Sequence, residues 1–144
     1  MMFESGNKQA PVADFSFHHV GVSVVDLAAS VAWYESVLGF EFSRTINIPA
    51  LAARVTVLKR GTMHVELFEV EGSEAPAEDR SDPHGDLLTH GTKHVGFVVA
   101  DVPAFAEQLR QRGADVISVN HFKFGCNTFV RDNSGNILEF VQAR

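Results

Sequence analysis

Two histidines and two glutamates occupy matching places in two copies of one short sequence pattern. The first copy reads HVGVSVVD from His19, and the second reads HVGFVVAD from His94. A glutamate in an alternating apolar stretch follows each copy, Glu66 in MHVELFEV and Glu139 in ILEFVQ. The separations from histidine to glutamate are 47 and 45 residues, so the four residues are equivalent members of an internal repeat.

Imidazole and carboxylate groups at these positions favour a metal-ion site. Strand alternation places them opposite the apolar residues that pack beneath a helix. A carboxylate between apolar neighbours is costly to bury unless it is paired or binds a cation. A lone strand histidine is more often an ordinary surface residue, but four repeat-related side chains favour a divalent first-row metal with positions left for water or substrate. Around a pseudo-twofold axis, we expect the four to converge on one point.

The elements that must position these residues form two βαβββ modules. In the first, a strand precedes Asp26, an N-cap for a helix over 27–38 that ends at Gly39. In the second, Asp101 caps the corresponding helix, and Gly113 ends it. One half alone buries too little surface to be stable, so the halves must pack together. We expect an α+β fold in one domain over 16–144, with module one at about 16–70, a polar linker at about 71–92, module two at about 93–142 and a flexible arm over 1–15.

Composition excludes several classes of partner. The chain has 144 residues, a formal net charge of −6 and no basic run, which argues against nucleic acid and anionic membranes. The single cysteine, Cys126, allows no internal disulfide. No segment has the apolar length of a signal peptide or a transmembrane helix. We therefore expect a cytoplasmic protein that acts on a small molecule.

The sequence resembles the vicinal oxygen chelate superfamily, which includes glyoxalase I, methylmalonyl-CoA epimerase, extradiol dioxygenases and bleomycin-resistance proteins. The matching phrases are HHVGVSVVDLAASVAWYESVLGF, HVELFE, KHVGFVVADV and RDNSGNILEFV. The resemblance implies paired modules that form a cupped mixed β-sheet with the helices outside. It also implies a homodimer, with each site formed either within one chain or from modules of two subunits. The implied cofactor is a divalent ion (Ni, Co, Zn, Mn or Fe) held by four ligands, His19, Glu66, His94 and Glu139.

The resemblance points to three kinds of activity. A four-ligand set favours an isomerase, epimerase or lyase of the glyoxalase I type, in which Glu66 and Glu139 move a proton next to a metal-bound carbonyl. An iron-dependent dioxygenase uses two histidines and one glutamate. A metal-free binder of the bleomycin-resistance type generally lacks the metal set.

The substrate pocket is harder to assign from sequence. Bacterial glyoxalase I has an arginine and an asparagine where this chain has Ser23 and Val70, so a glutathione adduct is not indicated. We assign Phe122 and Phe124 to covering a hydrophobic substrate, and Arg54 and Lys123 to binding its carboxylate or phosphate group. His18 lies next to His19, and strand alternation places it on the opposite face, away from the metal ligands.

Overall fold

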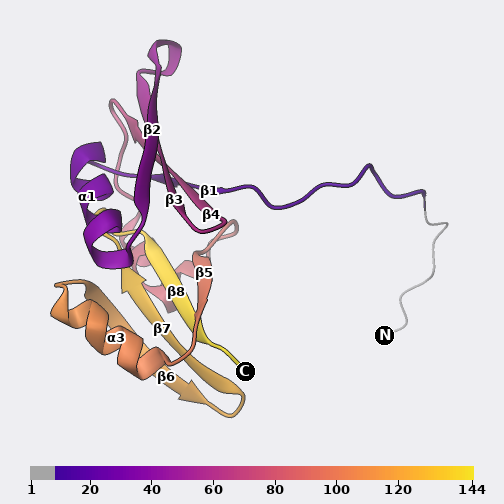
Figure 1. Ribbon diagram of the computed structural model, residues 1–144, viewed down its shortest axis with the longest axis vertical. Coiled ribbons are helices and arrows are strands. Elements are labelled where there is room, and N and C mark those ends of the chain that lie inside the picture. The colour runs from indigo at the N-terminus through magenta and orange to yellow at the C-terminus, as the bar shows by residue number, and fades with distance from the viewer. Residues whose placement is uncertain (1–8) are drawn as a thin grey trace.

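The computed structural model of the protein describes residues 9–144, so the first eight residues of the expected N-terminal arm lie outside the described range. Residues 9–19 form neither helix nor strand. Figure 1 shows this segment extending away from the two modules. Its two phenylalanines, Phe15 and Phe17, are exposed.

Each half of the chain forms one βαβββ module. Module one comprises β1 (Val20–Ser23), α1 (Leu27–Leu38), β2 (Glu41–Ile48), a 3₁₀ turn η1 (Pro49–Leu51), β3 (Ala53–Arg60) and β4 (Met63–Val70). Module two comprises β5 (Val95–Val99), α3 (Val102–Gln111), β6 (Asp115–Phe122), β7 (Gly125–Arg131) and β8 (Ile137–Gln142). The identical element order confirms the α+β class and the repeat.

The modules form two separate four-stranded sheets, in the orders β1-β4-β3-β2 and β5-β8-β7-β6. In each sheet the first strand pairs in parallel with the last, and the other pairs are antiparallel. The parallel registers place Gly21 opposite Glu66 and Gly96 opposite Glu139. The two copies of the His-Val-Gly phrase therefore hold the same place in their sheets.

Both helices begin at the aspartates that the sequence indicates. Asp26 accepts a hydrogen bond from the backbone N–H of Ala29, and Asp101 accepts one from Ala104, both at 3.0 Å. Helix α1 ends at Gly39, whose φ of 73° is a left-handed conformation that glycine adopts at little cost. Because the caps fix where each helix starts, they also fix the loop that leaves the histidine-bearing strand.

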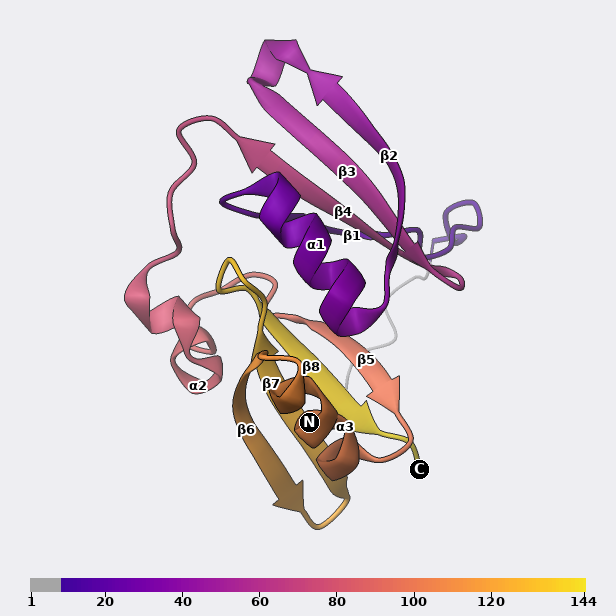
Figure 2. The ribbon, with the colours of Figure 1, turned by 60° about the vertical axis from the view of Figure 1, so that its left-hand side comes forward.

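One apolar core joins the two modules. Figures 1 and 2 show α1 and α3 on the same side of their sheets, so neither of these two helices covers the other face of its sheet. The buried cluster includes Tyr34 and Phe40 from module one and Leu138 and Phe140 from module two. Phe40 contacts Phe97 edge to face, at 6.5 Å between ring centroids. The modules are thus packed through their helix-side residues.

The linker has a structure of its own. It contains a 3₁₀ turn, η2 (Glu78–Ser81), and a single helical turn, α2 (Pro83–Asp86). Asp86 is only 2% exposed and accepts hydrogen bonds from Arg80 at 2.7 Å and from Lys93 at 3.4 Å. Lys93 also donates to the backbone carbonyls of Asp86 and Thr89. These bonds hold the linker against the residue that precedes His94.

Within residues 9–144, no helix has both the length and the apolar character needed to cross a lipid bilayer.

Candidate metal centre

The first module brings His19 and Glu66 into direct contact. The imidazole Nε2 of His19 lies 3.0 Å from the Oε2 of Glu66. The side chains are 36% and 21% exposed, so both remain within reach of a ligand from solution. His19 immediately precedes β1, and β4, which carries Glu66, is the parallel neighbour of that strand.

The second module repeats this arrangement. His94 Nε2 lies 3.2 Å from Glu139 Oε2, and the side chains are 28% and 19% exposed. The ring of Phe129 packs edge to face on His94, at 5.5 Å between centroids. Phe129 also lies opposite Glu139 in the β7–β8 register, so it borders both members of the pair. Sequence reasoning did not single out Phe129, although its alternation with Val130 signals a place on this face.

The four side chains do not meet at one point within a single chain. Among residues 9–144, no three histidine, cysteine, aspartate or glutamate side chains are close enough together to hold one metal ion. One chain taken alone therefore does not form the expected four-ligand site, and convergence of modules from two subunits stays a prediction. The physical reason is that the modules pack through their helix-side core, and β1 and β5 do not pair into one sheet.

Each pair nevertheless has the donor chemistry of half a metal centre. Imidazole nitrogen and carboxylate oxygen bind zinc and related ions at about 2.0–2.2 Å. Two such donors at right angles on one ion lie about 3.0 Å apart, close to the 3.0 Å and 3.2 Å observed between Nε2 and Oε2. The residues therefore fit a divalent ion, which His19 and Glu66 would hold from one module and His94 and Glu139 from another.

His18 does not follow the strand alternation that the sequence suggested. Strand β1 begins at Val20, so His18 and His19 lie before the strand and their side chains need not point to opposite faces. The Nδ1 atoms of the two rings lie 2.7 Å apart, at hydrogen-bond distance. His64 lies beyond, its ring centroid 5.7 Å from that of His18. The prediction that His18 faces away from His19 is therefore wrong.

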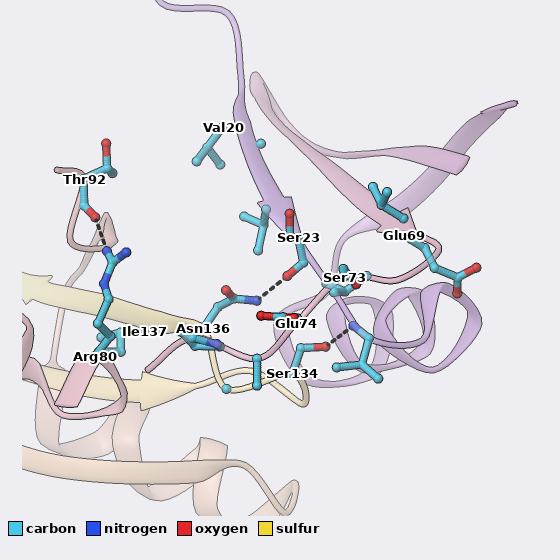
Figure 3. Close-up of a pocket in the computed structure, with 18 of the residues that line it drawn as sticks. Val20, Ser23, Glu69, Ser73, Glu74, Arg80, Thr92, Ser134, Asn136 and Ile137 are labelled. Carbon is cyan, nitrogen blue, oxygen red and sulfur yellow. Dashed lines mark hydrogen bonds between the residues drawn. The ribbon is translucent and has the colours of Figure 1, made fainter. Parts of the chain in front are cut away.

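A cavity of about 980 Å³ opens between the two modules. Its lining comes from β1, from Arg54 and the end of β4, from the linker, from the residues around His94 and from residues 134–138. Figure 3 shows the polar contacts in its wall, where Asn136 donates to the carbonyl of Ser23 and Ser134 accepts from the backbone N–H of Val25. The cavity is bordered by His94 and by the strand that follows His19.

Arg54 lies on the other side of its sheet from Glu66. Its guanidinium donates to Glu69 at 2.7 Å, and Glu69 also accepts from the backbone N–H of Leu27 at 2.7 Å. The Leu27 N–H and then the Arg54 guanidinium lower the pKa of the Glu69 carboxyl. Because Glu66 and Glu69 are three positions apart on one strand, their side chains point to opposite faces. The structure thus places Arg54 beside the start of α1, away from Glu66, and in the lining of the cavity between the modules.

The other proposed pocket residues lie at the β6–β7 turn. Phe122 and Phe124 are 53% and 76% exposed, and Lys123 lies over the Phe124 ring, 5.6 Å from its centroid. None of the three lines the cavity between the modules.

Two further residues, Arg44 and Phe68, lie on the metal-facing side of the first sheet. The alternation of MHVELFEV predicts this face for Phe68, and sequence reasoning missed Arg44. The registers align Arg44 with Val57 and Val57 with Glu66, so Arg44 points to the same side as Glu66, two strands away. Among residues 9–144, no carboxylate lies within ion-pair distance of Arg44. Phe68 packs over Gly21, where an added Cβ would lie 2.9 Å from its ring. The face of Arg44 could have been found from the alternation of EFSRTINI.

The repeated βαβββ fold, with a histidine and a glutamate paired in each module, is that of the vicinal oxygen chelate proteins. The chain belongs to the glyoxalase/bleomycin resistance protein/dioxygenase superfamily, whose family model matches residues 16–140.

Three known proteins illustrate this relationship. The chain is 27% identical over 133 residues to an ethylmalonyl-CoA/methylmalonyl-CoA epimerase from Cereibacter sphaeroides, a match covering 87% of this chain and 96% of the relative. A glyoxalase family protein from Enterococcus faecalis superposes with a TM-score of 0.75 at 24% identity, covering 88% of this chain and 97% of the other. The antibiotic binding protein TnmS3 from Streptomyces sp. CB03234 gives a TM-score of 0.67 at 17% identity, covering 93% and 100%. The two structural matches support the fold.

Proposed function

We propose that the protein is a metal-dependent enzyme of the glyoxalase I type, an isomerase, epimerase or lyase that moves a proton next to a carbonyl group of a small molecule. The observation that carries the proposal is the repetition of one pair, His19–Glu66 and His94–Glu139, at 3.0 and 3.2 Å. The two modules hold the same two donor types in the same geometry, which a random surface contact does not explain.

The residues have distinct roles in this chemistry. A divalent ion, when bound, supplies Lewis acidity that makes the carbon-bound proton next to the carbonyl easier to remove. His19 and His94 present neutral Nε2 atoms as ligands. Glu66 and Glu139 approach the substrate from two modules, so one carboxylate takes the proton and either the same or the opposite one returns it. Return by the same carboxylate restores the original configuration at carbon, and return by the opposite one inverts it.

The site is completed by a second copy of the chain in this proposal. Neither α1 nor α3 covers the faces that carry the His–Glu pairs, and the outer edges of β1 and β5 have no strand partner within residues 9–144. Val98, which shares a face of β5 with Gly96, is 66% exposed. A homodimer that places module one of one subunit against module two of the other would bring two pairs together and cover this apolar surface.

The epimerase relative suggests which substrates to test first. The epimerase relative from Cereibacter sphaeroides acts, by its name, on acyl-CoA thioesters, whose carbonyl acidifies the neighbouring carbon. A suitable panel is therefore methylmalonyl-CoA, ethylmalonyl-CoA and the hemithioacetal of glutathione and methylglyoxal. Incubation in D₂O with each compound, followed by proton NMR, detects exchange at the carbon next to the carbonyl whether or not net turnover occurs.

A second candidate function is a metal-free small-molecule binder. It is favoured by the absence of three clustered donors among residues 9–144 of one chain, and by the cavity of about 980 Å³ between the modules. The fold also occurs in the antibiotic binding protein TnmS3.

The first experiment separates the two functions. Untagged protein is purified without chelator, and its metal content is measured beside that of a His94→Ala variant. About one divalent ion per site in the wild type, lost in the variant, supports the enzyme. Protein that contains no metal and takes up none on soaking supports the binder, and the element found distinguishes proton transfer from oxygen-dependent iron chemistry.

A further inference from the structure

The histidine that precedes the first proposed ligand makes a hydrogen bond of its own to that ligand. The Nδ1 atoms of His18 and His19 are 2.7 Å apart, and the rings meet edge to face at 5.0 Å between centroids. The second nitrogen of His19, Nε2, points to Glu66 at 3.0 Å. Both nitrogens of His19 are therefore engaged by named partners.

These two contacts restrict where the protons lie. A bond between two imidazole nitrogens needs one proton, because one nitrogen must donate and the other accept. Without metal, His19 Nε2–H donates to the Glu66 carboxylate, so a neutral His19 has a bare Nδ1 that accepts from His18 Nδ1–H. A metal ligand needs a bare Nε2, and the ring proton of His19 must then sit on Nδ1 and donate to His18.

We infer that His18 is a positioning residue for His19, a role that rests on the proposed function. It holds the ring of His19 toward Glu66 and adapts to either tautomer. In the metal-free state the pair carries protons on His19 Nε2 and His18 Nδ1. In the metal-ready state the protons are on His19 Nδ1 and His18 Nε2, and they reach these positions by exchange with solvent.

The two halves of the metal site differ in this respect. In the second module Lys93 takes the place of His18, and its ammonium group is held by Asp86 and by linker carbonyls. Lys93 thus anchors the backbone before His94, while Phe129 packs on the ring. His18 is specific to module one, and its loss should affect the His19 half of the site alone.

The test uses ¹⁵N-histidine-labelled protein and three variants. His18→Ala removes the partner of His19, and His18→Asn keeps an amide that can donate to or accept from Nδ1. His121→Asn changes an exposed histidine outside the site as a matched control. Long-range ¹H–¹⁵N NMR reports the tautomer of His19 in metal-free protein, and competition with a chelator reports the affinity for zinc.

We expect metal-free wild type to hold His19 in the Nε2–H form, and His18→Ala to shift it to a mixture of tautomers. Zinc affinity should fall by about 10-fold in His18→Ala and recover in His18→Asn, while His121→Asn stays at the wild-type value. An unchanged His19 spectrum together with unchanged zinc affinity in His18→Ala overturns the inference. A wild type that binds no zinc defeats the proposed function instead, and the tautomer measurement then decides the role of His18 by itself.

Discussion

The phenol of Tyr34 donates a hydrogen bond of 2.8 Å to the carboxylate of Asp132, and this bond joins helix α1 of module one to the β7–β8 turn of module two. Tyr34 is 1% exposed and Asp132 is 4% exposed. The other carboxylate oxygen accepts from the backbone N–H groups of Ser134 and Asn136. The buried carboxylate of Asp132 has hydrogen-bond donors at both oxygens, so the loss of one donor should lower the free energy of unfolding.

Tyr34→Phe should lower the free energy of unfolding by about 2 kcal/mol, because it removes a hydrogen bond to a buried charged group. Urea denaturation monitored by circular dichroism measures the change. Thr45→Val is the comparison, since it breaks the 2.8 Å bond between Thr45 and Thr56 inside one module. That variant should lose about 1 kcal/mol. A loss under about 0.5 kcal/mol for Tyr34→Phe would show that the inter-module bond contributes little to stability.

The same tyrosine should resist ionisation in alkali. Burial, followed by the charge and hydrogen bond of Asp132, raises the pKa of Tyr34 well above its ordinary value. Because the folded pKa exceeds the unfolded one, this contribution to stability is complete below about pH 10 and is lost as pH rises further. Tyr34 is the single tyrosine of the chain, so phenolate absorbance near 295 nm reports it alone. We expect that absorbance to appear together with unfolding; a reversible titration near pH 10 in folded protein would contradict burial.

Acid should weaken the contacts of Asp86 with Arg80 and Lys93, which hold the linker to module two. Hydrogen bonding from Arg80, with its charge and that of Lys93, lowers the pKa of Asp86 against the opposing effect of burial. A lowered folded pKa gives stability that is present above the ordinary carboxyl range, near 3.9, and is lost as pH falls through the folded value. Asp86→Asn should reduce the urea midpoint at pH 7 and show a smaller further decline toward pH 3 than wild type. Parallel pH curves for the two proteins would exclude this role.

A mixture of two inactive variants tests whether sites are shared between subunits. His19→Ala and His94→Ala should each abolish metal binding and deuterium exchange. If each site combines module one of one subunit with module two of the other, a mixed dimer contains one intact site and one doubly altered site. Unfolding and refolding an equal mixture should therefore restore about a quarter of the wild-type sites, by the symmetry of a twofold dimer. Recovery of no sites indicates that each chain builds its own.

Local patterns explain what the sequence could and could not predict. Alternation and helix caps depend on neighbouring residues, so both helix starts at Asp26 and Asp101 and the repeated order of elements were predictable. How the modules dock depends on long-range contacts such as Phe40 with Phe97, and no local pattern reports these. For this reason the sequence left open whether the four ligands meet within one chain or between two. The helical turns inside the linker were not predictable, because Asp86 holds this segment through ion pairs with Arg80 and Lys93 and not through apolar periodicity.

Two arginines of one hairpin provide the final prediction, because they point to opposite faces of the first sheet. Arg44 shares the face of Glu66, and Arg54 is bound to Glu69 on the helix-covered face. For any anionic compound that shows exchange in D₂O, Arg44→Met should raise KM with little change in unfolding free energy.

Arg54→Met is the matched comparison. Arg54 lines the cavity between the modules and not the His–Glu face, so its loss should leave KM unchanged when the substrate binds at the His–Glu face. The substitution removes one partner of Glu69, whose pKa is lowered first by the Leu27 N–H and then by Arg54. The carboxylate keeps the Leu27 bond, so the urea midpoint should fall slightly at pH 7 and converge with wild type as Glu69 is protonated in acid. If instead Arg54→Met alters KM and Arg44→Met does not, the substrate lies on the helix-covered side, and the assignment of the His–Glu face as the active face is wrong.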